Sequence, residues 1–306
     1  MNKLGIHAFV WTGSSVQKDL EAAVEISHDL GFRLIEFPRL NTDVFDVPAL
    51  ARLLQARGMG VAVTMGLPKD ADVSSEDRET VARGEALLND GVAVARDLGA
   101  KKLGGILFSM HGKYTSAPTE AGRRNSVDVI RRVAERAERA GVTLNLEIVN
   151  RFETNLLNTV AQGLKFIDDV GSDNVFLHLD TFHMNIEEAS PAEAIRAAGA
   201  KLGYFHIGES NRGYLGAGTI DFDAAFDALL DIGYDDFMTF ESFSSEVVDK
   251  DLSLTCGIWR NTWKDNVDLA RHAKAFIEER YENAQRRRAA TRGPSVKTPK
   301  LAASVA

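Results

Sequence analysis

The sequence predicts a single (β/α)₈ TIM barrel followed by a short basic tail, and three observations support this. Amphipathic stretches repeatedly end at a glycine and are followed by a short apolar run. Those runs are mostly continuous rather than alternating, which is typical of strands covered on both faces. Eight candidate strands alternate with eight candidate helices, which is the order of such a barrel. We expect the barrel to occupy residues 1–282 and the tail residues 283–306.

The candidate strands follow one another at similar intervals. The first candidate strand is LGIHAFV. Each of the other seven follows a glycine that ends a helical stretch, and glycine is favoured there because it adopts the left-handed conformation without a Cβ penalty. The junction glycines are Gly31, Gly58, Gly99, Gly141, Gly171, Gly199 and Gly233, and they precede the runs LIEF, VAVT, LGGILF, TLNLEI, VFLHL, YFHI and FMTF.

The helical segments have support of their own. From Thr154 to Val170 the apolar residues repeat with the helical period. Ser190-Pro191-Ala192-Glu193 has the pattern of a capping box with proline at the first helical position. A pattern from Trp259 to Tyr281 predicts the eighth helix. The alternative is an open doubly wound sheet, but no glycine-rich phosphate loop follows any strand.

Charge is distributed unevenly along the chain. The net charge is −8, yet residues 283–306 hold six basic and no acidic residues. Residues 1–282 therefore hold 30 Lys and Arg against 44 Asp and Glu, a net −14. A body this acidic is unsuited to nucleic acid, whose phosphates dominate affinity. The tail has few large apolar residues, so we expect it to be disordered.

The compartment expected from the sequence is the cytoplasm. The single cysteine, Cys256, has no partner for a disulfide, and no CxxC or Cys/His cluster suggests a zinc site. No signal peptide is recognisable, and no apolar run approaches the roughly 20 residues of a membrane span. We therefore expect no membrane partner.

Ionisable side chains recur where the candidate strands end. In (β/α)₈ barrels the chemistry lies at the C-terminal ends of the strands. The second strand carries Glu36, and later ones carry or lead into Glu147, Asp180, His206 and Glu241. Taken singly, each acidic residue could be a helix cap or an ion-pair partner, and His206 a core histidine. Together, Glu147, Asp180, His206 and Glu241 predict a mostly oxygen-donor site suited to Mn²⁺, Mg²⁺ or Co²⁺.

Further polar residues follow these positions. They suit a small, hydroxyl-rich substrate, which needs several donors and acceptors to replace its hydration. The candidates are Asn150, Arg151, Glu153, His183, Glu209 and Arg212, with Phe9, Trp11, Phe108 and Met110 as candidate apolar walls or ordinary core residues.

The segments around these residues resemble a known family. LEIVNRFETNLLNT, HLDTFHMNIEE, FHIGESNRG and TFESFSS are similar to the ketose 3-epimerases, which include D-tagatose, D-allulose (D-psicose) and L-ribulose 3-epimerases within the xylose isomerase-like TIM barrels. GIHAFVW and IWRNTW look most like the D-allulose/L-ribulose subgroup. The resemblance spans residues 3–280.

The resemblance implies roles for particular residues. Glu147, Asp180, His206 and Glu241 would bind one Mn²⁺, Mg²⁺ or Co²⁺ ion, with no organic cofactor. Glu147 and Glu241 would also be the catalytic acid/base pair, while Glu153, His183 and Arg212 would bind the sugar. The family resemblance also implies a homodimer or homotetramer. His7 and the segment 64–66 depart from some members at the pocket wall, which leaves the preferred ketose open.

The implied reaction is inversion at C3 of a free ketose. One glutamate removes the proton next to the carbonyl, a metal-stabilised cis-enediolate forms, and the other glutamate returns a proton on the opposite face. We expect the fifth and eighth strands to lie across the barrel, which suits this two-sided transfer. Three alternatives remain: an aldose–ketose isomerase, an endonuclease IV-like repair enzyme and a non-catalytic sugar-binding barrel.

Overall fold

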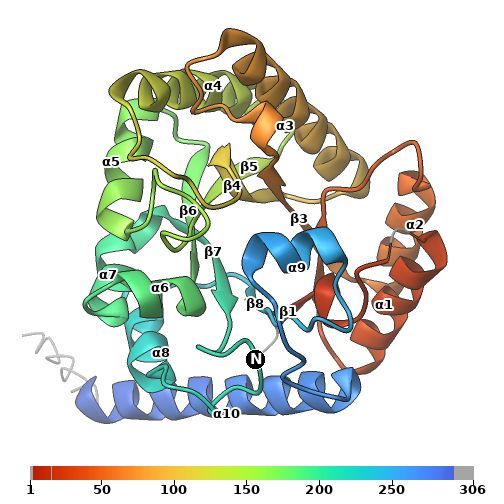
Figure 1. Cartoon of the computed structure of the whole chain (residues 1–306). Coiled ribbons are helices and arrows are strands. Elements are labelled where there is room, and N and C mark those ends of the chain that lie inside the picture. The colour runs from red at the N-terminus through yellow and green to blue at the C-terminus, as the bar shows by residue number, and fades with distance from the viewer. Residues whose placement is uncertain (1–2, 15, 293–306) are drawn as a thin grey trace, which may run out of the picture.

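The computed structural model describes residues 3–14 and 16–292, and eight parallel strands form its centre (Figure 1). They close into a barrel in sequence order, and β1 pairs with both β2 and β8. The predicted barrel is therefore confirmed, and the open sheet is excluded. The strands are β1 (Leu4–His7), β2 (Leu34–Pro38), β3 (Gly60–Leu67), β4 (Lys102–Met110), β5 (Thr143–Ile148), β6 (Val175–Asp180), β7 (Leu202–Ile207) and β8 (Met238–Phe240).

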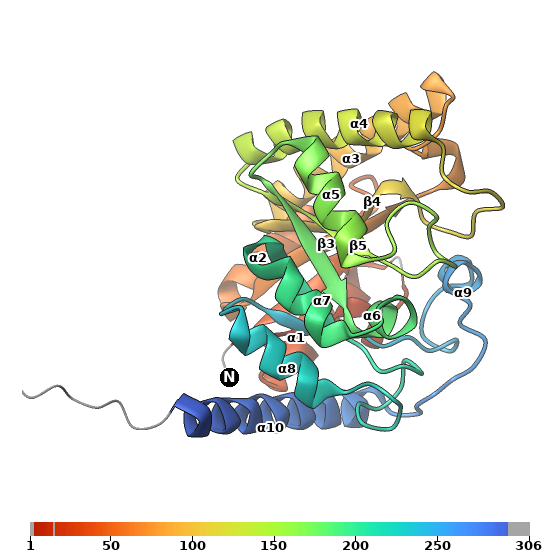
Figure 2. The ribbon, with the colours of Figure 1, turned by 90° about the vertical axis from the view of Figure 1, so that its left-hand side faces the viewer.

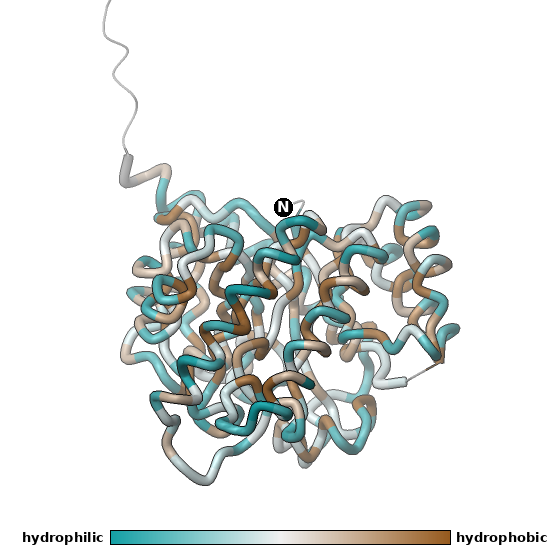
Figure 3. The backbone as a smooth tube through the Cα atoms, turned by 90° about the horizontal axis from the view of Figure 1, so that it is seen from above, coloured by the Kyte–Doolittle hydropathy of each residue, from teal (hydrophilic) through white to brown (hydrophobic). Residues whose placement is uncertain are grey.

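Helices surround the barrel, and Figure 3 shows hydrophilic and hydrophobic positions alternating along them. This pattern is expected when one face of each helix packs on the sheet and the other meets solvent. The helices are α1 (Gln17–Asp29), α2 (Val47–Arg57), α3 (Arg78–Leu98), α4 (Glu120–Arg139), α5 (Val160–Val170), α6 (Thr181–Glu187), α7 (Pro191–Ala198), α8 (Phe222–Asp231), α9 (Lys250–Cys256) and α10 (Asn266–Arg292), with short 3₁₀ turns at Ala8–Val10, Lys69–Ala71 and Gly199–Lys201.

The junction glycines behave as the sequence predicts. All seven have a positive φ, from 51° at Gly199 to 85° at Gly31. At Gly58, Gly99 and Gly171 the residue is the left-handed cap that ends α2, α3 and α5. A side chain at these positions would be strained, which is why glycine marks each helix-to-strand junction.

Two helices begin later than the sequence predicts. The helix expected from Thr154 begins at Val160, because Thr159 and Gln162 form a capping box and the preceding segment is a loop. The helix expected from Trp259 begins at Asn266. Residues 259–265 belong to the connection that joins the separate helix α9 to α10. Apolar periodicity extended both predictions across loop residues, such as the buried Leu156 and Leu157 before α5 and the exposed Trp259 before α10.

The cap at Ser190 is half of the predicted capping box. Its side chain accepts a hydrogen bond from the Glu193 backbone N–H, and Pro191 occupies the first turn. The Glu193 carboxylate instead pairs with Arg196 at 2.7 Å. The helix start is therefore as predicted, with a different partner for Glu193.

Helix α10 continues beyond the expected boundary at residue 282 and ends at Arg292. Ala284 is fully buried, and Arg287 pairs with Asp223 and Asp227 of α8. These contacts fix residues that composition alone placed in the tail. The rest of the predicted tail, 293–306, lies outside the described residues. None of the described helices is long and apolar enough to cross a membrane.

Loops and short helices gather at the end of the barrel to which the strands point. Figure 2 shows α6 and α9 on this side, and Figure 1 shows α9 lying over the barrel opening. Connections that follow the strands therefore meet one another here, above the polar side chains at the strand ends.

Candidate active site

The four predicted metal ligands converge at this end of the barrel. Glu147 lies on β5, Asp180 ends β6, His206 lies on β7, and Glu241 directly follows β8. One candidate ligand atom from each residue lies within 4.8 Å of the others. All four side chains are buried, Asp180 completely. Three carboxyl groups do not gather this closely in a protein interior without a positive partner.

Strand register explains part of this convergence. Asp180 and His206 are paired neighbours on β6 and β7, so their side chains start from the same level of the barrel. The expectation that β5 and β8 lie across the barrel is wrong in detail. They are three strands apart in the closed order, with β6 and β7 between them. Glu147 and Glu241 therefore flank His206 and Asp180 instead of facing each other across a full diameter.

His206 presents one ring nitrogen to the cluster and uses the other to hold its orientation. Nε2 lies 2.7 Å from Oε2 of the buried Glu36, which also accepts a hydrogen bond from the Tyr204 hydroxyl at 2.5 Å. Nδ1 has no hydrogen-bond partner and lies 3.5 Å from Glu241 and 3.8 Å from Glu147. A buried nitrogen left unpaired among carboxylates fits a cation ligand, and a carboxylate behind it is the usual support.

His178 lies behind the cluster on β6. Its ring centroid is 4.0 Å from that of His206, and Nδ1 is 3.8 Å from Glu147. Both of its ring nitrogens are buried without a hydrogen-bond partner among the described residues. Burial holds the pKa of His178 well below its usual value, so this imidazole is neutral.

Arg212 is the positive group closest to the cluster. Nη1 lies 2.8 Å from both Asp180 and Glu241, and the guanidinium stacks over Phe182 with 4.0 Å to the ring centroid. Arg212 is also the one non-glycine residue with a positive φ, 56°, within the described ranges. Backbone strain of this kind is retained where the surrounding structure requires a particular side-chain position.

The two predicted acid/base residues are tuned in opposite directions. Burial raises the pKa of Glu147 well above its usual range, and the charges of Glu241 and Asp180 add to the effect. Burial acts the same way on Glu241, but Arg212 and His206 outweigh it and lower its pKa well below its usual range. Opposed tuning of two neighbouring carboxyls is characteristic of an acid/base pair.

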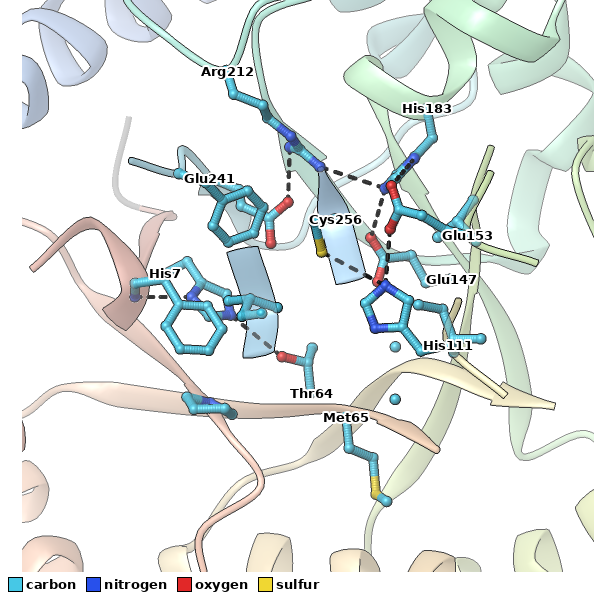
Figure 4. Close-up of a pocket in the computed structure, with 18 residues that line it drawn as sticks. His7, Thr64, Met65, His111, Glu147, Glu153, His183, Arg212, Glu241 and Cys256 are labelled. Carbon is cyan, nitrogen blue, oxygen red and sulfur yellow. Dashed lines mark hydrogen bonds and ion pairs between the residues drawn. The ribbon is translucent and has the colours of Figure 1, made fainter. Parts of the chain in front are cut away.

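The three residues predicted to bind substrate surround the same space (Figure 4). His183 lies 3.8 Å from Glu147 and 3.9 Å from Glu153, and Arg212 is 3.4 Å from its Nε2. Asn150 donates to Glu153 at 2.8 Å and contacts Nδ1 of His183 at the same distance. Although burial opposes ionisation, His183 and His111 lower the pKa of Glu153 to about 2. Glu153 is therefore a fixed negative acceptor beside the cluster.

A cavity opens over these residues. Phe9, Met65, Phe243 and Leu252 contribute apolar surface to it. Its wall also includes the two departures from the family pattern, His7 and the segment 64–66. A mostly apolar cavity with a few convergent polar groups is typical of a small-molecule site.

Several other candidates from the sequence have structural roles. Arg151 pairs with Glu187, and Glu209 accepts hydrogen bonds from the backbone of Ser210 and Gly216. Among the candidate apolar walls, only Phe9 lines the cavity described above. Trp11 donates to Ser27, and Phe108 is buried in the core. Met110 lines a separate surface pocket.

The sequence reasoning missed His111 and Cys256, which both line the cavity. His111 directly follows β4, so the rule that chemistry follows the strand ends could have identified it. Cys256 lies at the end of α9, far from any strand in the sequence. No local pattern could have placed it in the cavity.

Comparisons with known proteins agree with this geometry. Residues 24–279 match the family described as xylose isomerase-like TIM barrel. The L-ribulose 3-epimerase of Mesorhizobium japonicum is 55% identical over 287 residues, which cover 94% of this chain and 97% of that protein. The chain is a ketose 3-epimerase of the xylose isomerase-like TIM barrel family.

Solved structures of ketose 3-epimerases share the whole fold. A structure of L-ribulose 3-epimerase superposes with a TM-score of 0.94 at 54% identity, covering 98% of this chain and all of that one. The D-allulose 3-epimerase of Methylomonas sp., in complex with D-allulose, gives a TM-score of 0.88 at 43% identity, with coverages of 92% and 98%. The resemblance inferred from the sequence motifs is therefore confirmed, and the chain is an isomerase.

Proposed function

We propose that the protein inverts C3 of free ketoses of the L-ribulose and D-allulose type, with D-tagatose/D-sorbose as a further candidate pair. The observation that carries this proposal is the pair of carboxyl groups of Glu147 and Glu241. They flank one small volume and have pKa values shifted in opposite directions. Epimerisation needs one group that takes a proton and another that returns one.

Glu147, Asp180, His206 and Glu241 would hold one divalent cation. Their donor set of three carboxylates and one imidazole suits Mn²⁺, Mg²⁺ or Co²⁺, and the unpaired Nδ1 of His206 supports a cation at this place. Such a cation supplies Lewis-acid polarisation of the substrate carbonyl. Because Glu36 and Glu241 raise the pKa of His206 against the effect of burial, cation binding requires this ring to release a proton.

The glutamates would divide the proton transfer between them. In the protein without a cation, burial raises the pKa of Glu147 and Arg212 lowers that of Glu241, so Glu147 holds a proton more readily than Glu241 does. One carboxylate removes the proton on C3, and the carboxylic acid of the other returns a proton to the opposite face of that carbon. In the reverse reaction the roles exchange, as microscopic reversibility requires.

Glu153, His183 and Arg212 would orient the ketose beside these carboxyls. Glu153 would accept hydrogen bonds from sugar hydroxyls, and the neutral His183 ring, whose Nδ1 accepts from the Asn150 backbone N–H, would offer its Nε2–H as a donor. Arg212 donates while keeping Glu241 ionised. The carbon to be inverted is thereby held within reach of both glutamates.

The reaction in D₂O tests the proposed function. With purified enzyme, one divalent cation and either L-ribulose or D-allulose, we expect the C3 epimer to carry deuterium at C3. An aldose product formed without deuterium uptake would instead support the alternative of a hydride-shifting isomerase. The turnover of a panel of ketoses, each assayed with Mn²⁺, Mg²⁺ and Co²⁺, then identifies the preferred sugar and the most activating cation.

Assembly as a homodimer or homotetramer belongs to the same proposal. Trp259, on the connection between α9 and α10, is 71% exposed, and a large exposed aromatic side chain suits an interface between copies. Light scattering of the purified protein measures the assembly directly. A monomer at micromolar concentration would contradict this part of the proposal.

The cytoplasmic location remains a prediction from the sequence.

A further inference from the structure

A second group of metal-binding side chains lies in the same cavity, outside the four predicted ligands. His111 comes from the segment after β4, Glu153 from the loop after β5, and Cys256 from the end of α9. One ligand atom of each lies within 4.8 Å of the others. Figure 4 shows the three side chains directed toward one another, next to His183.

The imidazole of His111 lies within reach of both other side chains of this group. Nε2 of His111 lies 2.9 Å from Oε2 of Glu153 and 3.7 Å from Sγ of Cys256. In a tetrahedral zinc site, usual bond lengths place sulfur and nitrogen about 3.6 Å apart and nitrogen and oxygen about 3.4 Å apart. The sulfur–nitrogen separation already fits, and the carboxylate needs to withdraw by only a few tenths of an ångström.

The donor set differs in kind from that of the four predicted ligands. It offers one thiol, one imidazole and one carboxylate, whereas the other set has no sulfur. Thiolate ligands favour Zn²⁺ over Mg²⁺ and Mn²⁺, and three protein ligands leave a fourth position for water. We propose that His111, Glu153 and Cys256 form a second cation site, selective for Zn²⁺, whose occupation inhibits the enzyme.

The proton balance of binding is simple. Glu153 is already ionised, since its pKa is about 2. Burial raises the pKa of the Cys256 thiol well above its usual value, so the thiol enters the reaction protonated. The S–H bond breaks, its proton passes to solvent, and sulfur bonds to the cation. Nε2 of His111 gives up its hydrogen bond to Glu153 and binds the cation as the tautomer that carries the ring proton on Nδ1. Binding therefore weakens as the pH falls.

Inhibition follows from the position of the site. Glu153 is one of the residues that would orient the ketose, and a cation bound to its carboxylate removes that acceptor. The His183 ring lies between Glu153 and Glu147, so the second site adjoins the first. The cation would also tie α9 to the loops after β4 and β5, across the opening of the cavity. This consequence rests on the proposed function, whereas binding itself does not.

Spectroscopy tests the site independently of activity. Co²⁺ replaces Zn²⁺ in such sites, and only a thiolate ligand produces a sulfur-to-cobalt charge-transfer absorption in the near ultraviolet. We expect this absorption when Co²⁺ is added to the Mg²⁺-loaded enzyme, and its loss when Zn²⁺ follows. Because Cys256 is the only cysteine in the chain, Cys256→Ser must abolish the absorption. Its absence in the wild type would overturn the proposal.

Inhibition is measured as the ratio of turnover with and without Zn²⁺ in each variant. Removal of a residue that only hydrogen-bonds a metal ligand lowers metal affinity about 10–100-fold, and removal of a ligand itself should cost at least as much. We therefore expect Cys256→Ser and His111→Gln each to raise the inhibitory Zn²⁺ concentration at least about tenfold. Equal inhibition of wild type and Cys256→Ser would place the effect at the other cation site and contradict the proposal. If no epimerase activity is found at all, the cobalt absorption still decides whether the second site exists.

Discussion

The floor and the rim of the cavity are built differently. The floor consists of Glu36, Glu147, Asp180, His206 and Glu241, which lie on strands or directly after them and are buried. The rim consists of His111, Glu153, Leu252 and Cys256, which come from loops and α9. Strand register holds the floor groups, whereas loop conformation and helix packing place the rim groups. We therefore expect changes in the floor to affect chemistry and changes in the rim to affect binding.

The largest expected effect is the loss of either glutamate in the floor. Glu147→Gln and Glu241→Gln each remove a group that transfers a proton, which typically contributes about 10²–10⁴-fold to the rate. We expect turnover to fall by at least that much while circular dichroism and melting behaviour remain close to those of the wild type. Near-normal turnover in either variant would overturn the assignment of the acid/base pair.

The next largest effect, a loss of cation affinity, is expected at Glu36, which contacts the ring nitrogen of His206 that faces away from the cluster. Glu36→Gln keeps the volume but removes the charge that orients the ring and raises its basicity, so cation affinity should fall about 10–100-fold. Calorimetric titration with Mn²⁺ measures this. Tyr204→Phe is the matched control, because it removes the other hydrogen bond to Glu36 and leaves the carboxylate in place. Unchanged Mn²⁺ affinity in Glu36→Gln would show that His206 does not depend on this contact.

Removal of the cation should lower stability as well as activity. A ligand that binds only the folded state adds about 2.7 kcal/mol at a concentration 100 times its Kd. We expect dialysis against a chelator to abolish turnover and lower Tm, and added Mn²⁺ or Co²⁺ to restore both. Asp180→Asn, which weakens the same donor set, should reduce the rise in Tm on adding the cation. A chelated protein with full turnover would contradict a metal-dependent floor.

A rim substitution should change KM more than kcat. Leu252 lines the cavity from α9 and is not one of the groups proposed to transfer protons. Loss of a few apolar contacts is worth about 1–3 kcal/mol in discrimination between substrates. We expect Leu252→Ala to change KM, and the ranking of ketoses, with a smaller change in kcat. A fall in kcat as large as that of the glutamate variants would remove the distinction between floor and rim.

The smallest effect is expected far from both regions. Arg287 of α10 pairs with Asp223 and Asp227 on the surface, and exposed ion pairs contribute about 0–1 kcal/mol. Arg287→Ala should lower Tm by a few degrees at most and leave kcat and KM unchanged. A large loss of activity would mean that α10 influences the cavity.

The floor could be predicted from the sequence because it depends on local patterns. Glu147, Asp180, His206 and Glu241 each follow or belong to an apolar run, and parallel strands in a barrel bring their C-terminal ends together. The junction glycines located the strands for a similar reason, since all seven have a positive φ, which glycine adopts without strain. The family motifs contained the same residues and added their expected roles.

The rim could not be predicted as a whole. Helix α9 is short and ends at Cys256, before the segment from Trp259 whose apolar pattern predicted the last helix, and no sequence pattern identified it. No sequence motif brings His111 and Cys256 together, because they are separated by 145 positions in the chain. Periodicity also missed the loop before α5, where Thr159 ends the loop with its capping box.

The sequence by itself determined the barrel, the order of its strands and the charged groups at their ends. These features follow from apolar runs and helix-ending glycines, which act over a few residues. The tertiary structure decided which ring nitrogen of His206 faces the cluster, the opposite tuning of Glu147 and Glu241, and the meeting of His111 with Cys256. These depend on burial and on contacts between distant segments, because a pKa or a donor set is a property of what surrounds a side chain in space.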